Sequence, residues 1–196
     1  MVVIMSKEIY VIDDNESKEY KYNIEEDTII YHFSINSSSN VEINLDKEDI
    51  NLYYYYNNIN YDDNSFNIKV NHNKDNTHSE VYNHGVNVSN NYLTYDVEGI
   101  VLKTSDKCIC NQDNQIINIK NGKSTIKPNL LIDNYDVDSN HAAYIGKFKD
   151  EYLFYLMSRG ISKKNAYLLL LKGFLINSDS IDLNKIDKFV KEMNKI

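Results

Sequence analysis

The chain has 196 residues, with 21 Lys and Arg against 29 Asp and Glu, which gives a formal net charge of −8. This acidic balance argues against a general nucleic-acid binder, which needs clustered cations, and no stretch reaches the roughly 18 apolar residues of a transmembrane helix. The two cysteines are too few to crosslink a chain of this size. We therefore expect a soluble, cytoplasmic protein that binds neither nucleic acid nor membrane. Met1 and Met5 are alternative start residues, and the apolar opening is too short for a signal peptide.

From about residue 8 to residue 148 the sequence shows short runs in which apolar and polar residues alternate. Such runs predict β-strands, which here are bounded by Asn, Asp and Ser, residues that form turns without glycine. The clearest runs are 9–12, 29–35, 41–45, 66–70 and 116–119. Asn121-Gly122 is the only plain hairpin signal. Many short strands with few hairpins and no interleaved helices fit either a sandwich or a parallel β-solenoid.

Helical periodicity begins near Asp150. Leu153, Phe154, Leu156 and Met157 predict one apolar helix face, which ends at Arg159-Gly160. Ser162 is expected to cap a second helix that carries Ala166, Leu169, Leu170 and Gly173 on one side. A third helix follows the polar segment 177–180, with Ile186, Phe189, Val190 and Met193 on its apolar face.

The tyrosine run 53–56 and three carboxylate pairs raise other functions. No basic groove accompanies the tyrosines, so we interpret them as core and edge residues of a strand. The pairs 13–14, 25–26 and 62–63 could supply an acid and a base, but adjacent residues point to opposite faces of a strand. Solvated loops are the better interpretation for these pairs. The sequence has no phosphate-binding loop or nucleophile motif of the common kinds, so we expect no enzymatic activity.

Two rare residues lie within a set of motifs in the second half of the chain. Arg159 is the only arginine and Pro128 the only proline. The motifs are KPNLLI at 127–132, DV at 136–137, HAAYIG at 141–146, LFYLMSRGI at 153–161 and a helix that ends in Gly173-Phe174. Together they resemble the C-terminal part of the SufB/SufD family of iron–sulfur cluster assembly proteins. The resemblance covers about residues 70–196, and the chain is much shorter than a usual member, so it looks N-terminally shortened.

Within that family the chain is more similar to SufD than to SufB. The SufB scaffold carries a cysteine, followed by Gly-Ala-His, six residues before the counterpart of Pro128. Here that position is Gly122, followed by Lys-Ser-Thr. The resemblance implies a mainly β fold, a right-handed parallel β-helix over residues 1–148 followed by a small helical domain over residues 149–196.

The resemblance also implies a function and partners. The chain is expected to be a non-catalytic subunit of the SUF assembly complex that pairs with a SufB-type scaffold and a SufC-type ATPase. The family's ATPase contact corresponds here to the helical segment, with Arg159, Leu153, Phe154 and Leu156 as candidate contacts. Arg159 could instead bind the carbonyl groups at its helix end. Unpaired strand edges also predict a homodimer when the chain is alone.

His141 matches the family histidine at the interface where a cluster is built. A neutral imidazole can ligate iron, so His141 is a candidate transient iron–sulfur ligand, without a stable metal site or a tightly bound cofactor. The family's Cys-Ser before this histidine is Ser139-Asn140 here, and the Gly after it is Ala142. A site would therefore depend on a cysteine of the partner.

The remaining candidates have structural explanations. Cys108 and Cys110 project on the same strand face, and buried cysteine is a common small apolar residue. Four further histidines have no metal-ligand spacing, namely His32, His72, His78 and His84. The alternative function is a structural, partner-binding β-helix that stabilises a complex without taking part in cluster formation. A carbohydrate-active enzyme would need a cleft with paired carboxylates, which no spacing supports.

Overall fold

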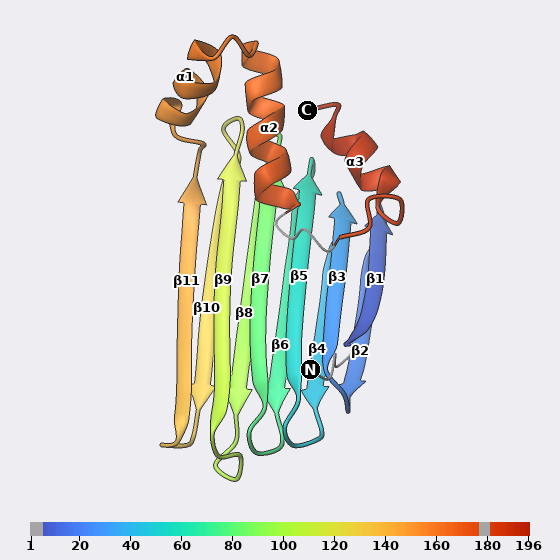
Figure 1. Cartoon of the computed structure of the whole chain (residues 1–196), viewed down its shortest axis with the longest axis vertical. Coiled ribbons are helices and arrows are strands. Elements are labelled where there is room, and N and C mark those ends of the chain that lie inside the picture. Colours follow the sequence, from blue (N-terminus) through green and yellow to red (C-terminus); the bar gives the residue numbers. More distant parts are fainter. Residues whose placement is uncertain (1–5, 177–180) are drawn as a thin grey trace.

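The computed structural model describes residues 6–176 and 181–196 and shows eleven strands followed by three helices (Figure 1). The first six strands are β1 (Lys7–Asp14), β2 (Lys18–Ile24), β3 (Thr28–Ile35), β4 (Ser39–Leu45), β5 (Asn51–Asn60) and β6 (Asn64–His72). The next five are β7 (His78–Asn87), β8 (Tyr92–Val101), β9 (Cys108–Asn118), β10 (Lys123–Ile132) and β11 (Val137–Gly146). The helices are α1 (Asp150–Ser158), α2 (Lys163–Leu175) and α3 (Asp187–Met193).

The strands alternate between two parallel sheets. The odd-numbered strands form a six-stranded sheet in the order β1-β3-β5-β7-β9-β11, and the even-numbered strands form a five-stranded sheet in the order β10-β8-β6-β4-β2. The two sheets run in opposite directions, so each odd–even pair makes one turn of a flattened solenoid (Figure 1). This decides between the two folds that the alternating pattern allowed. The mainly parallel β fold with C-terminal helices is confirmed.

Stacked side chains hold successive turns in register. Inside the solenoid, aliphatic and aromatic residues from both sheets form a continuous core, including Tyr54, Tyr56 and Phe66. Outside, Tyr31, Tyr55 and Tyr82 occupy consecutive rungs, with ring centroids 5.4 and 5.1 Å apart. A one-residue slip would move the inner set to the outer face. The prediction that the tyrosine run is part of a strand with core residues is confirmed, but none of the tyrosines is an edge residue, since β5 pairs with β3 and β7 on either side.

On the outer face of the even-numbered sheet, charges alternate in sign from rung to rung. Lys21, Glu42, Lys69 and Glu98 are consecutive partners across β2, β4, β6 and β8. Nζ of Lys21 lies 2.9 Å from Oε1 of Glu42. Opposite charges on neighbouring strands stabilise this alignment, and like charges would oppose a shifted one.

Asn and Asp make the tight turns that glycine commonly makes. Positive φ angles occur at Asn15, Asn36, Asp49 and Asn76, whose short polar side chains tolerate this region. The predicted hairpin at Asn121-Gly122 is wrong, because this segment connects β9 to β10 in the opposite sheet and the two strands do not pair. A turn signal specifies a local reversal and cannot specify which strand becomes the neighbour.

Helices α2 and α3 pack on the outer face of the odd-numbered sheet near the carboxyl ends of its strands (Figure 1). The ring of Phe189 lies 4.9 Å from that of Phe33 on β3. The ring of His84 on β7 stacks on Phe174 at 4.8 Å and donates from Nδ1 to the Phe174 carbonyl at 3.0 Å. The helices therefore share a hydrophobic cluster with the sheet.

The predicted C-terminal end of α1 and the predicted N-terminal cap of α2 are confirmed. Gly160 has a φ of +85°, and the Ser162 side chain accepts a hydrogen bond from the Asn165 amide. The predicted apolar side of α2 is only partly correct. Ala166 is buried, but Leu169 is exposed, and Leu171 and Leu175 face the sheet. Most of α2 is apolar, so contact with the sheet selects the buried stripe.

The domain boundary predicted after residue 148 lies just before α1, which begins at Asp150. Met1, Met5 and the connection predicted at 177–180 lie outside the described residues.

Phe189→Ala should lower the free energy of unfolding by about 3–5 kcal/mol, because it removes a fully buried ring at the junction of α3 and β3. Phe154→Ala is the matched control, since 76% of Phe154 on α1 is exposed and its loss should change stability by less than about 1 kcal/mol. Urea denaturation followed by circular dichroism measures both values. Equal stability of the two variants would contradict the shared core.

Candidate functional site at the last turn of the solenoid

The last turn of the solenoid is covered on one side only. β11 and β10 terminate their sheets, and each pairs with one neighbouring strand, β9 and β8 respectively. The inner side chains of β10, including Ile126, Leu130 and Ile132, are only half-buried, whereas their counterparts in earlier turns are buried. Along β11 no residue is fully buried. This end of the solenoid therefore presents a free strand edge and uncovered interior side chains.

His141 lies on β11 and faces the interior side of this open end. It is the rung partner of Gln112 on β9, which in turn is the partner of the buried Val81. The His141 side chain is exposed because no further turn covers it within the part of the chain that the structure describes. It makes no hydrogen bond or ion pair with those residues. The imidazole is thus available to a ligand or a partner at this end.

Both cysteines lie one turn deeper than His141 and are buried. Cys108 and Cys110 both face inward from β9, as the spacing predicted. Sγ of Cys108 lies 3.3 Å from the Thr77 hydroxyl. Burial raises the pKa of the Cys110 thiol to about 11, although a hydrogen bond with Ser79 lowers it slightly. A protonated, buried thiol is a poor metal ligand, so the structural interpretation of both cysteines fits their surroundings.

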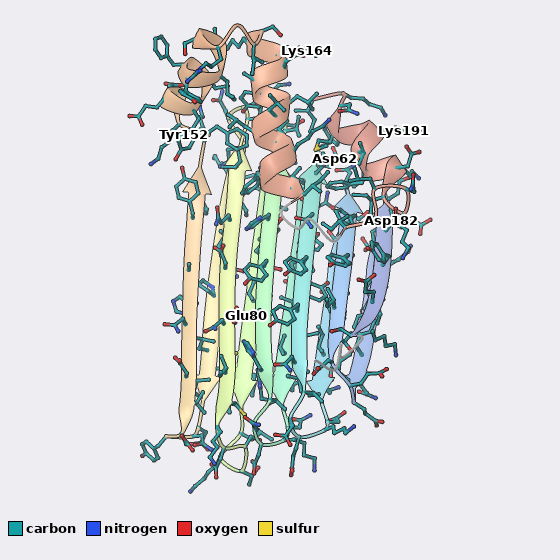
Figure 2. All side chains as sticks on the ribbon, in the orientation of Figure 1. Asp62, Glu80, Tyr152, Lys164, Asp182 and Lys191 are labelled. Atoms are coloured by element: carbon teal, nitrogen blue, oxygen red, sulfur yellow. The ribbon has the colours of Figure 1, made fainter. Side chains whose placement is uncertain are left out.

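Large apolar side chains are exposed along the same side of the molecule. They belong to β10 and β11, which are neighbours at one edge of Figure 1, to the turn that joins these strands at its lower end, and to α1, which lies above the upper end of β11. The set comprises Leu131, Tyr135, Tyr144, Ile145, Tyr152, Phe154, Tyr155 and Met157. Figure 2 shows Tyr152 projecting from α1. A concentration of exposed apolar residues marks an interaction surface.

Helix α1 contributes the predicted ATPase contacts to this surface. It has no buried residue: Phe154 is exposed, and Leu153 and Leu156 are half-buried. The Arg159 guanidinium lies 5.3 Å from the centre of the Tyr155 ring, and its backbone N–H caps the Leu156 carbonyl. The Arg159 side chain is therefore held over an exposed aromatic ring, where its charge stays accessible.

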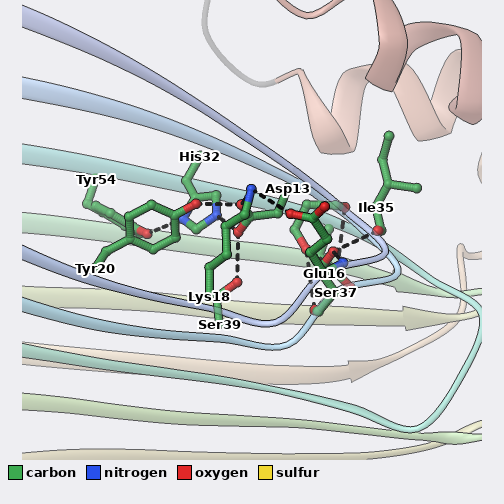
Figure 3. Close-up of polar contacts among 11 residues, drawn as sticks. Asp13, Glu16, Lys18, Tyr20, His32, Ile35, Ser37, Ser39 and Tyr54 are labelled. Carbon is green, nitrogen blue, oxygen red and sulfur yellow. Dashed lines mark hydrogen bonds and ion pairs between the residues drawn. The ribbon is translucent and has the colours of Figure 1, made fainter.

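A buried polar network at the opposite end of the solenoid was missed by the sequence analysis (Figure 3). Asp13 was interpreted as a solvated loop residue, but it lies on β1 and is fully buried. Three groups donate to the Asp13 carboxylate: Nε2 of His32 at 2.7 Å, the Tyr20 hydroxyl at 2.5 Å and the Ser39 hydroxyl at 2.9 Å. The Tyr54 hydroxyl completes the network, 2.7 Å from Nδ1 of His32.

Electrostatics keep this network charged. Burial by itself raises the pKa of Asp13, but the hydrogen bonds from His32, Tyr20 and Ser39 outweigh it and lower the pKa to about 2. The His32 ring and the hydroxyls of Tyr20, Ser39 and Tyr54 are all hydrogen-bonded within the network, and Tyr54 is fully buried. The partly exposed Lys18 also pairs with Asp13, at 3.5 Å, and the network crosslinks the first turns of the solenoid. The structural interpretation of His32 fits this position.

The other three histidines have local partners as well. The His72 ring lies 2.8 Å from the hydroxyls of both Thr77 and Ser79, and burial lowers its pKa to about 4. His78 lies 2.7 Å from Glu80, which points outward from β7 (Figure 2). His84 is hydrogen-bonded to α2. Within residues 6–176 and 181–196, no three His, Cys, Asp or Glu side chains gather in a way that could hold a metal ion. In the same ranges no helix is long and apolar enough to cross a membrane.

Comparison with known proteins identifies the family. The profile described as "SUF system FeS cluster assembly, SufBD core domain" matches residues 12–174, which include the open end and most of α2. The chain belongs to the SufBD family.

Individual family members match over short segments. SufD of Bacillus subtilis is 38% identical over 72 residues, which are 36% of this chain and 16% of the relative. SufB of the same organism is 33% identical over 87 residues, covering 41% and 18%. A SufBD family protein of Pyrococcus horikoshii is 52% identical over 40 residues, covering 20% and 9%. The matched part of the chain thus spans less than a fifth of each of these relatives, and both SufBD subunit types are similar to it.

Asp13→Asn should lower the free energy of unfolding by about 3 kcal/mol, because it removes a buried charge on which three donors converge. The depressed pKa also predicts a pH dependence. The contribution of Asp13 is complete above its ordinary pKa of 3.8 and is lost as the pH falls through about 2.

Asp14→Asn is the matched control, since Asp14 lies on the outer face, where it pairs with Lys188 of α3 and is partly exposed. Chemical denaturation at several pH values between 2 and 7 compares the two variants. A wild-type protein with the same acid sensitivity as Asp13→Asn would refute the proposed role of the charge.

Proposed function

We propose that this SufBD family member acts as a non-catalytic, SufD-like subunit in cytoplasmic iron–sulfur cluster assembly. In this proposal the open last turn binds a SufB-type scaffold and α1 contacts a SufC-type ATPase. The observation that carries the proposal is the exposed His141 on the uncovered inner face of β11. The SufD-like assignment rests on the wording of the motifs and on Gly122, which replaces the scaffold cysteine.

The free edge of β11 supports strand pairing as the mode of association. An edge strand offers unpaired backbone N–H and C=O groups, which a partner strand can complete. The half-buried Leu130 and Ile132 and the exposed Ile145 would be covered by the same partner. When no scaffold is present, a second copy of this chain could occupy the edge, which accounts for the proposed homodimer.

The side chains at this end of the solenoid suggest which cluster ligands the scaffold would have to supply. His141 supplies an exposed nitrogen, while the Cys110 thiol is buried and protonated. Clusters are held mostly by thiolates, and imidazole replaces some of them. A cluster that forms at this interface would therefore take its thiolate from the scaffold and one nitrogen from His141. It would pass through this site as cargo.

The alternative function is that of a structural subunit that stabilises the complex. Ser139 occupies the rung above Cys110, and Asn140 precedes His141 where the family has a Cys-Ser pair. Loss of that thiolate supports the structural alternative. Cluster formation requires the His141 imidazole as a ligand, whereas the structural function does not.

His141→Ala should leave the complex with the scaffold assembled and lower its iron and sulfide content, because it removes a nitrogen ligand from an exposed position. Anaerobic reconstitution of the size-checked complex, read by visible absorbance and iron analysis, measures the yield. Cys110→Ser is the control, which should lower thermal stability and leave the yield per folded complex unchanged. Normal cluster yield from the His141→Ala complex would favour the structural function.

Phe154→Glu should weaken binding of the SufC-type ATPase at least tenfold, because it places a charge in the centre of the exposed apolar surface of α1. Leu183→Glu is the matched control, since Leu183 is also exposed and apolar but lies beside α3. Isothermal titration of the ATPase with each full-length variant gives the affinities. Equal weakening by the two substitutions would count against α1 as the contact.

A further inference from the structure

Gln112 lies directly beneath His141 in the interior of the solenoid. The two residues are rung partners in the parallel pair β9–β11, so their side chains leave the same face of the sheet. Neighbouring strands are about 4.8 Å apart, a spacing at which two long side chains on one face can reach each other. Gln112 is 5% exposed, and His141 is exposed above it.

The amide of Gln112 has a defined orientation. Its Nε2 donates to the carbonyl oxygen of Asn129 on β10 at 3.2 Å. Exchanging the amide oxygen and nitrogen would bring two acceptors together, so this contact specifies which amide atom is the nitrogen. The remaining atom, Oε1, is an acceptor that is buried and has no hydrogen-bond partner among the described residues. A buried acceptor without a partner is rare and calls for a donor.

The strand that carries His141 is also anchored beside this acceptor. Nδ2 of Asn114 donates to the backbone carbonyl of Ala142 at 3.3 Å, and Nδ2 of Asn83 donates to Asn114 at 2.7 Å. Two consecutive inward positions of β9, Gln112 and Asn114, are thus amides, where the corresponding positions of β3 and β5 include aromatic rings. The core becomes polar immediately below His141.

We infer that Gln112 is the positioning residue of His141. Neither group makes this bond in the structure, and we infer that a turn of the exposed His141 ring lets one ring N–H donate to Oε1. That bond selects one tautomer of the neutral imidazole and leaves the other nitrogen free, facing the open end. Histidines that ligate metals commonly have their second nitrogen oriented in this way by a carbonyl or carboxylate. The contact itself is independent of cluster assembly, and its use in ligation rests on the proposed function.

The tautomer of His141 tests the inference in the full-length protein without any metal. Ring nitrogen chemical shifts, recorded on ¹⁵N-labelled protein at a pH where the imidazole is neutral, report the tautomer ratio. The His141 signals are assigned by their loss in His141→Ala. Gln112→Met keeps a side chain of similar length but has no amide oxygen, and should change the tautomer ratio about fivefold, the effect of a typical net hydrogen bond. Gln112→Glu, which retains an acceptor, should restore the wild-type tautomer.

Gln115→Met is the matched control, because Gln115 lies on the same strand but faces outward, where it donates to Asp113. It should leave the His141 ratio unchanged. The same ratio in wild type and in Gln112→Met would overturn the inference, and so would equal changes in Gln112→Met and Gln115→Met.

Cluster yield separates this inference from the proposed function. If Gln112→Met alters the tautomer of His141 and lowers the cluster yield of the complex, the positioning role of Gln112 and the proposed function both hold. If the tautomer changes while His141→Ala leaves the yield normal, the positioning contact stands and the proposed function fails.

Discussion

In this fold each turn of the solenoid is covered by the turns on either side of it, and the rest of the structure depends on that constraint. Parallel strands stacked in register bury the interior residues of every inner turn, and the terminal turns lack one neighbour. The outer face of the odd-numbered sheet is apolar near the carboxyl ends of its strands, and α2 and α3 cover it there. The last turn keeps its inner side chains half-buried or exposed.

The two ends of the solenoid treat their polar groups differently. At the first turns, Asp13 and His32 are buried and saturated with partners, so their charge and hydrogen bonds stabilise the fold. At the last turn, His141 is exposed and the acceptor of Gln112 below it has no partner among the described residues. Burial keeps the Cys110 thiol protonated, whereas the His141 nitrogen is exposed as a candidate iron ligand. Exposed apolar residues of β10, β11 and α1 lie on the same edge of the molecule. The proposed function relies on this exposed nitrogen and on the apolar residues around it.

Local features of the chain were predictable from the sequence alone. Alternation of apolar residues predicted the strands, Asn and Asp supplied the left-handed turn positions, and Ser162 and Gly160 marked helix ends. Rare residues inside motifs, Pro128 and Arg159, indicated the family, and the profile match over residues 12–174 confirmed it. Each of these signals acts through the backbone conformation of a few neighbouring residues, or through a motif written in consecutive positions.

Which residues become neighbours across turns was decided only by the tertiary structure. Alternation could not distinguish a solenoid from a sandwich, because both bury one face of each strand. Asp13 looked like a loop residue because its donors are supplied by other strands. The buried stripe of α2 and the position of Gln112 beneath His141 likewise depend on the packing of separate elements. Which side chains are buried, and which hydrogen-bond to one another, depends on how the turns stack. The sequence of a single strand does not specify it.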